Sequence, residues 1–258
     1  MYQLLRQSGY DDDHIILIIE DNLASDPKNV YPGQIFIERT SAANAGDALA
    51  NDDVRRGTVI DYRFSDLRRE DIADILMGKA SSRLPHVIRP DSASNVFIFW
   101  SGHGGSSEGP LWGNEDAGEY FGIENIRNAI TRMSATISDH GPGNAQPRMY
   151  RRMMLAVEAC YSGKWGEALT GLPDVLVLTA ANANETSKAD VFDQQLGVYL
   201  SNAFSRTFRQ HVGMRPDVTI YDLYRELYRT TTGSHVSVYN NQQYGSVYTE
   251  TMADYFPQ

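Results

Sequence analysis

Met153-Met154-Leu155-Ala156-Val157-Glu158-Ala159 is a nearly continuous apolar run, and the single cysteine of the chain, Cys160, follows it directly. Such a run is typical of a strand that is covered on both faces in a parallel sheet. A second run, Asn95-Val96-Phe97-Ile98-Phe99-Trp100, leads into Ser101-Gly102-His103-Gly104-Gly105. A thiol and an imidazole therefore each follow an apolar strand, and this arrangement suits a nucleophile and its base.

Strands and amphipathic helices alternate on either side of these two runs. We expect strands at residues 15–19, 95–100, 153–159, 175–180 and 235–239, and helices at 2–7, 65–77, 122–138, 191–211 and 219–230. This alternation predicts an α/β sandwich whose mostly parallel sheet has helices on both faces. Functional sites of such sheets form outside the carboxyl ends of the strands, where His103 and Cys160 lie.

The bulk properties of the chain are those of an ordinary globular domain. It has 258 residues, 41% hydrophobic and 22% charged, so it can bury a large core without disulfides. We treat 1–258 as a single domain in which the polar, turn-rich segment 21–63 is an inserted loop region. A net charge of -10 and a pI of about 5.0 argue against a nucleic-acid partner.

Metal, cofactor and membrane signals are weak in this sequence. One cysteine excludes an internal disulfide and a thiolate metal cluster, and no histidine has the spacing of a metal-ligand motif. No phosphate-binding loop motif is present, so we expect neither a metal nor a cofactor. The sequence has no run that approaches the roughly 20 apolar residues of a transmembrane helix, and 1–10 lacks the apolar region of a signal peptide.

Cys160 and His103 have two interpretations: a catalytic thiol with its base, or two residues without a catalytic role. A thiol attacks a carbonyl as the thiolate, and a neighbouring imidazole or helix N-terminus lowers its usual pKa of about 8.5. The backbone N–H groups of Gly104 and Cys160 are suited to form an oxyanion hole. In the simpler alternative, Cys160 is a small buried hydrophobic residue and His103 is a loop histidine.

Glu158 is a carboxylate inside an apolar strand, and burying it without a partner is costly. Strand alternation places it on the same side as Cys160. One interpretation makes Glu158 a wall of the pocket that holds a substrate side chain. The other makes it the partner of Arg151 or Arg152 in a salt bridge.

Around these residues the chain resembles the legumain family, the asparaginyl endopeptidases that also include the catalytic subunit of the glycosylphosphatidylinositol transamidase. The matching segments are Phe97-Ile98-Phe99-Trp100-Ser101-Gly102-His103-Gly104, Val157-Glu158-Ala159-Cys160-Tyr161-Ser162-Gly163 and Leu178-Thr179-Ala180-Ala181-Asn182-Ala183-Asn184-Glu185-Thr186-Ser187. Ser234-His235-Val236 is similar too. The similarity extends over most of residues 2–239.

The resemblance implies a caspase-like sandwich with a mostly parallel six-stranded sheet. It implies that His103 and Cys160 are the catalytic dyad, and that Glu158 lines the S1 pocket with Thr186 or Ser187 near its rim. The implied activity is that of a cysteine endopeptidase that cuts a protein or peptide through a thioester of Cys160. The alternatives are a transamidase-like transfer of the acyl group to an amine and a non-catalytic binding module of caspase-like fold.

Three departures from the family pattern limit what the resemblance implies. Legumains have an Asp, linked to ligase chemistry, where this chain has Gly102, and another Asp, which recognises asparagine, where it has Val198. Specificity for Asn at P1 therefore does not follow. The family also has a strand before the helix at 2–7, so we expect the chain to be N-terminally incomplete. An export signal would then be missing as well, and a periplasmic or cell-surface location stays open.

Overall fold

The computed structural model describes residues 1–39, 52–114, 119–134 and 148–257. Within these residues, the central sheet has the strand order β1 (Asn95–Ser101), β6 (Arg152–Glu158), β7 (Val175–Thr179) and β10 (Ser237–Tyr239). β1, β6 and β7 are parallel to one another, and β10 is antiparallel to β7. The predicted mostly parallel sheet is confirmed, although the described residues form a four-stranded sheet and not the six-stranded one that the resemblance implies.

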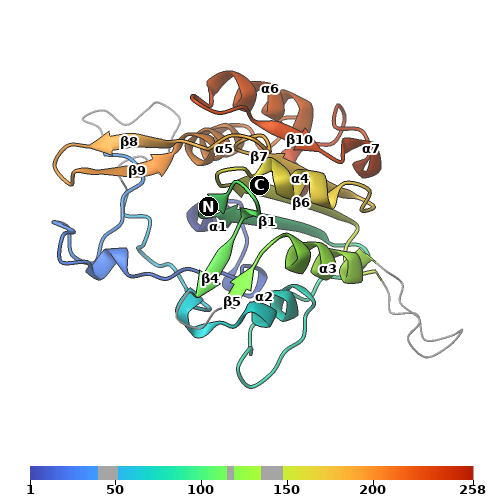
Figure 1. Cartoon of the computed structure of the whole chain (residues 1–258), viewed down its shortest axis with the longest axis horizontal. Coiled ribbons are helices and arrows are strands. Elements are labelled where there is room, and N and C mark those ends of the chain that lie inside the picture. The colour runs from blue at the N-terminus through green and yellow to red at the C-terminus, as the bar shows by residue number, and fades with distance from the viewer. Residues whose placement is uncertain (40–51, 115–118, 135–147, 258) are drawn as a thin grey trace, which may run out of the picture.

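Helices cover both faces of this sheet (Figure 1). One face packs against α2 (Arg69–Leu76), α3 (Ile123–Ser134) and α4 (Gly163–Leu169), and the other against α1 (Tyr2–Gln7), α5 (Ala203–Met214) and α6 (Ile220–Thr230). Side chains of β6 alternate between the two cores, with Leu155 and Val157 in the first and Met154 and Ala156 in the second. Because both faces are covered, residues 153–157 of this strand are all apolar, and the predicted three-layer sandwich is confirmed.

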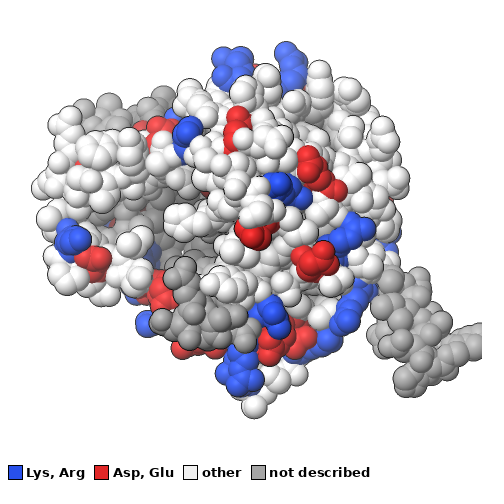
Figure 2. All heavy atoms as spheres, viewed as in Figure 1, with Lys and Arg blue, Asp and Glu red and all other residues white. Residues whose placement is uncertain are grey.

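The remaining elements are short and lie outside the sheet. They are the ribbons β2 (Gly104–Gly105) with β3 (Gly109–Pro110), β4 (Trp112–Asn114) with β5 (Glu119–Phe121) and β8 (Ala189–Asp193) with β9 (Val198–Asn202), then α7 (Asn241–Tyr244), and 3-10 turns at Asp12–His14, Leu23–Ser25, Phe64–Asp66 and Met252–Asp254. The β8–β9 hairpin projects from the body at the left of Figure 1. Figure 2 shows that this face of the molecule is hollowed beside the hairpin and that its charges of both signs are scattered.

The expectation of a strand at 15–19 is wrong. This run forms a single isolated bridge, between Ile18 and Tyr62. The N–H of Leu17 donates to the Asp61 carboxylate at 2.8 Å, and the N–H of Ile19 donates to the carbonyl of Tyr62 at 3.1 Å. Because the segment 61–62 satisfies these backbone groups, the run does not join the sheet.

The predicted helices agree with the structure to different degrees. The helix expected at 191–211 starts only at Ala203, because 191–202 form the β8–β9 hairpin, whose turn includes Gly197 at φ 68°. The helix at 219–230 is confirmed as α6, and the Thr219 hydroxyl caps it by accepting the N–H of Asp222 at 3.1 Å. The end of the helix expected at 122–138 lies outside the described residues.

Candidate active site

The segments that follow β1 and β6 leave the sheet side by side. Ser101 is paired with Glu158 in the strand register, and the N–H of Gly102 donates to the carbonyl of Glu158 at 3.0 Å. A Cβ atom at Gly104 would overlap the carbonyl oxygen of Cys160. The backbone of the His103 loop therefore rests directly on the backbone of Cys160, and only glycine permits this approach.

The two predicted catalytic side chains differ in exposure. His103 is exposed, whereas Cys160 is half-buried and its Sγ atom lies 4.0 Å from the carbonyl oxygen of Ser187. In the described part of the chain, no hydrogen bond joins the imidazole to the thiol. The structure thus brings the two segments together, and the assignment of a Cys-His dyad stays a prediction.

Contacts on both sides of the β2–β3 ribbon hold the backbone of the His103 loop. The N–H of Leu111 donates to the carbonyl of His103 at 3.2 Å. The buried indole of Trp165, in α4, donates to the carbonyl of Pro110 at 2.9 Å. Since α4 follows Cys160 closely in the chain, the histidine loop and the cysteine turn share one support.

The turn after Cys160 is fastened to the loop that follows β7. Tyr161 has a left-handed backbone, with φ 54°, and its N–H donates to the carbonyl of Glu185 at 2.7 Å. The buried hydroxyl of Ser162 donates to the carbonyl of Ala181 at 3.1 Å and accepts the N–H of the same residue at 3.0 Å. These bonds fix a strained residue next to the thiol, and such strain persists only where the surroundings over-determine it.

Gly163 explains why these two segments fit together. A Cβ atom at this position would overlap the backbone nitrogen of Ala183 and the hydroxyl of Tyr239. Any larger residue at the start of α4 would push the loop away from Cys160. Residues 161–163 thus form a turn directly after Cys160, and the loop that follows β7 packs against this turn.

Glu158 is 1% exposed and faces α5. The N–H and the hydroxyl of Ser205 both donate to its Oε2 atom, at 3.0 and 3.1 Å. Burial raises the pKa of Glu158 above its ordinary value, although the nearby Ser187 and Ser205 groups act in the opposite direction. Among the described residues, Oε1 of Glu158 has no hydrogen-bond partner, so one buried carboxyl oxygen is left to accept or share a proton.

The salt-bridge interpretation of Glu158 is wrong. Arg151 pairs with Asp254 at 3.2 Å, and Arg152 pairs with Glu250. Arg152 is the first residue of β6 and Arg151 precedes it, whereas Glu158 is the last residue of the strand. The length of the strand separates them.

The other predicted pocket residues lie on the loop after β7. Ser187 is half-buried beside the thiol, and its hydroxyl is among the groups that lower the pKa of Glu158. The hydroxyl of Thr186, also half-buried, accepts a hydrogen bond from the Lys188 ammonium at 2.8 Å. The pocket roles of Ser187 and Thr186 stay predictions, as does the oxyanion hole of the Gly104 and Cys160 N–H groups.

Sequence reasoning missed four residues that build this site. Ser162 and Ser205 are ordinary serines by spacing, and Glu185 and His235 are far apart in the chain and lie 2.8 Å from each other. Ser162, Glu185 and His235 lie in segments that carry the resemblance, whereas Ser205 lies outside the quoted ones. None of the four has a local pattern that indicates its partner.

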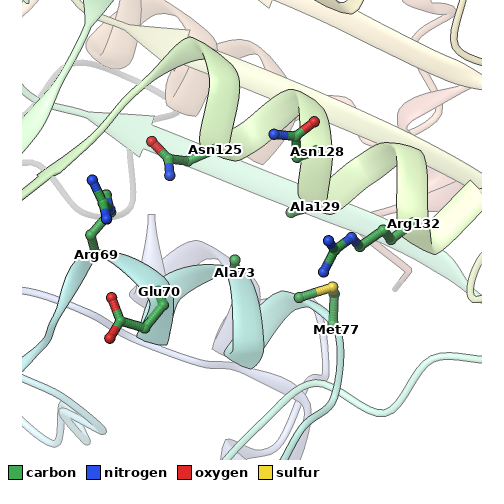
Figure 3. Close-up of a pocket in the computed structure, with 8 residues that line it drawn as sticks. All are labelled: Arg69, Glu70, Ala73, Met77, Asn125, Asn128, Ala129 and Arg132. Carbon is green, nitrogen blue, oxygen red and sulfur yellow. The ribbon is translucent and has the colours of Figure 1, made fainter.

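A pocket between α2 and α3 does not belong to this site. Its lining residues are Arg69, Glu70, Ala73, Met77, Asn125, Asn128, Ala129 and Arg132 (Figure 3). None of the residues predicted for the site is among them. Within the described residues, no three His, Cys, Asp or Glu side chains are grouped to hold a metal ion, and no helix has the length and apolarity to cross a bilayer.

Comparison with known proteins gives consistent matches. The Peptidase C13 family matches residues 1–254. Legumain from Rattus norvegicus is 26% identical over 251 residues, and legumain from Homo sapiens is 27% identical over 249; each match covers 93% of this chain and 51% of the relative. GPI-anchor transamidase from Bos taurus is 25% identical over 207 residues, 80% of this chain and 46% of the relative. The chain thus spans about half the length of these relatives.

Proposed function

Because the chain belongs to the Peptidase C13 family, we propose that it is a legumain-like cysteine endopeptidase with Cys160 as nucleophile and His103 as general base and acid. The observation that carries the proposal is the contact of the Gly104 backbone with the Cys160 carbonyl. This contact brings the histidine loop to the cysteine turn at the carboxyl ends of β1 and β6. In free enzymes, catalytic hydrogen bonds are often long and tighten when substrate binds.

The reaction proceeds by acyl transfer through a thioester. His103 takes the proton of the Cys160 thiol, and Sγ attacks the carbonyl carbon of the scissile peptide bond. The N–H groups of Gly104 and Cys160 stabilise the oxyanion of the tetrahedral intermediate. The intermediate collapses, the C–N bond breaks, and His103 gives its proton to the leaving amine. Water, deprotonated by His103, then attacks the thioester and releases the acid and the thiol.

The substrate is a protein or peptide with a polar or small P1 side chain. The acceptors that we assign to the P1 side chain are Oε1 of Glu158, which has no hydrogen-bond partner among the described residues, and the hydroxyl of Ser187, whose backbone carbonyl lies 4.0 Å from Sγ of Cys160. Thr186 precedes Ser187 on the same loop, and we assign it to the rim of the pocket. A P1 side chain with an N–H or O–H donor would pair with Glu158 and remove its unsatisfied oxygen.

Covalent labelling tests the proposal. A peptidyl acyloxymethyl ketone should label the protein at Cys160, and the label should be lost in Cys160→Ala. A peptide library should then be cut with a P1 preference for donor side chains. A folded wild-type chain that neither takes the label nor cuts any peptide would refute the peptidase and support a non-catalytic module.

Acyl transfer to an amine is the second candidate, and the similarity to GPI-anchor transamidase favours it. The thioester is common to both reactions, so the acceptor decides between them. Cleavage in the presence of an added amine, followed by mass spectrometry, separates the products. A peptide acid as the main product identifies the hydrolase, whereas a peptide amide identifies the transferase.

A further inference from the structure

Glu185 joins three segments of the chain through one side chain. Its Oε1 atom accepts the N–H of Asn182 at 3.0 Å and the N–H of His235 at 2.7 Å. Its Oε2 atom lies 2.8 Å from Nδ1 of His235. The carboxylate therefore ties its own loop to His235, two residues before β10, and the contact combines a charge with several donors.

The main chain of Glu185 reaches the nucleophile turn. Its carbonyl accepts the N–H of Tyr161 at 2.7 Å, and Tyr161 is the left-handed residue that follows Cys160. Two residues further along the loop, the carbonyl of Ser187 lies 4.0 Å from Sγ of Cys160. A displacement of Glu185 would thus reach both the turn that carries the thiol and the group beside the thiol.

The partner segment is itself anchored. The buried hydroxyl of Ser234 donates to the carbonyl of Ala180 at 2.6 Å, so the chain just before His235 is held at the end of β7. The ring of His235 lies 6.4 Å from the ring of Tyr228 in α6, centroid to centroid. His235 is thus a fixed point to which Glu185 can be tied, although its side chain is largely exposed.

We propose that Glu185 and His235 are a positioning pair that sets where the thiol of Cys160 stands relative to the substrate pocket. The inference rests on the proposed function for its catalytic meaning. The positioning itself is a property of the fold and can be tested without catalysis. Neither residue touches the reacting atoms; each acts through the Tyr161 N–H and the loop that ends at Ser187.

Reaction with iodoacetamide tests the position of the thiol directly, because Cys160 is the single cysteine of the chain. Glu185→Ala should speed the alkylation of Cys160, since the loosened loop uncovers a half-buried thiol. Glu185→Gln should stay close to wild type, because an amide oxygen still accepts both backbone N–H groups. An unchanged alkylation rate in Glu185→Ala would overturn the inference, whether or not the chain is a peptidase.

Labelling of Cys160 by a peptidyl acyloxymethyl ketone should become slower in the same variant. In Glu185→Ala the rate constant kinact should fall about tenfold to a hundredfold, the scale that a misplacement of about 1 Å produces, while KI changes less. In His235→Ala, kinact should fall by a smaller factor, because Glu185 still accepts the hydrogen bond from the Asn182 N–H. The double variant should be no slower than Glu185→Ala, since the two residues act as one unit.

The matched control is Glu226→Ala, which breaks an exposed pair with Arg229 on α6. It should leave both rates unchanged. A purely structural role for Glu185 would lower the labelled fraction or the melting temperature while kinact per labelled site stays constant, and that result would also overturn the inference. A wild-type chain that resists the peptidyl probe would refute the peptidase, and the iodoacetamide measurement would still decide on the positioning pair.

Discussion

The turn after Cys160 and the loop after Ser101 lie against each other, but they are held in different ways. Ser162 and Gly163 are buried, and hydrogen bonds and close contacts join them to a loop about twenty residues away. Gly102 and His103 are exposed, and the described contacts of their loop are made by its backbone, with Glu158, with Leu111 and, through Pro110, with Trp165. The turn that carries the thiol is thus held by buried contacts, whereas the imidazole is exposed to solvent.

The position of the thiol therefore depends more on tertiary contacts than the position of the imidazole does. A nucleophile that must meet a carbonyl carbon at a set angle gains from a rigid support. A base that serves first the thiol, then the leaving amine and then water has to reach three positions. A substitution at His103 should therefore lower the reaction rate, whereas one in the turn after Cys160 should lower the free energy of unfolding.

The largest effect should come from His103→Ala. Acylation by a peptide substrate should fall by about 10²–10⁴-fold, because a positioned base contributes on that scale. The free energy of unfolding should change by no more than about 0.5 kcal/mol, since the side chain is exposed. Steady-state kinetics and urea denaturation of the same preparation measure both quantities.

His14→Ala, which also removes an exposed imidazole, is the control for His103→Ala. It should leave both the rate and the stability as they are in wild type. If His103→Ala retained full activity, His103 would have no part in the mechanism.

We expect a smaller effect from Gly163→Ala, which should lower the free energy of unfolding. The new methyl group would overlap the Ala183 nitrogen and the Tyr239 hydroxyl, and overpacking of this kind typically costs about 1–3 kcal/mol. Thermal and urea denaturation measure it. Gly213→Ala is the control: its Cβ would meet Leu4 at an ordinary 3.4 Å, and within a helix the change should be neutral or slightly stabilising. Equal stability of both variants would contradict the tight fit of the turn.

The smallest effect should be a change in pH dependence caused by Glu158→Gln. Burial raises the pKa of Glu158 in the folded state, so the folded chain binds more protons than the unfolded chain above the unfolded pKa of about 4.3. Stability from this group is present at low pH and is lost as the pH rises through the folded pKa.

Glu158→Gln should therefore gain stability relative to wild type as the pH rises from the unfolded pKa of about 4.3 toward neutrality. The gain cannot exceed about 1.4 kcal/mol per pH unit, the limit for one proton. Urea denaturation at several pH values measures it. A stability difference that stays constant over this range would mean that Glu158 does not titrate differently in the folded state.

The parts of the fold that could be predicted are those fixed by short-range pattern. β6 and β7 are buried on both faces and hence continuously apolar, and α6 carries its own N-cap in Thr219. The run at 15–19 has the same apolar pattern but pairs with residues 61–62. Pattern alone does not say whether a neighbouring strand is available.

Residues 191–202, expected to start a helix, form the β8–β9 hairpin. Its structure depends on a left-handed Gly197 and on cross-strand pairs such as Phe192 with Tyr199. In the same way, His103 and Cys160 follow from their places at strand ends. The contacts of Glu185 with His235, and of Glu158 with Ser205, join distant parts of the chain and have no local signal.

Tyr239 lies over Gly163 and Gly166, so close that a methyl group on either glycine would overlap the tyrosine side chain. Tyr239 belongs to β10, the strand of the sheet that comes last in the sequence, while the two glycines lie in α4 directly after the cysteine turn. The start of α4 therefore reaches its final packing only after β10 has docked on β7. During synthesis, β10 is made after β1, β6 and β7, so the turn that follows Cys160 cannot reach its final packing before residues 237–239 have been added to the chain. Until then, the chain would contain Cys160 without the packed turn that positions its thiol.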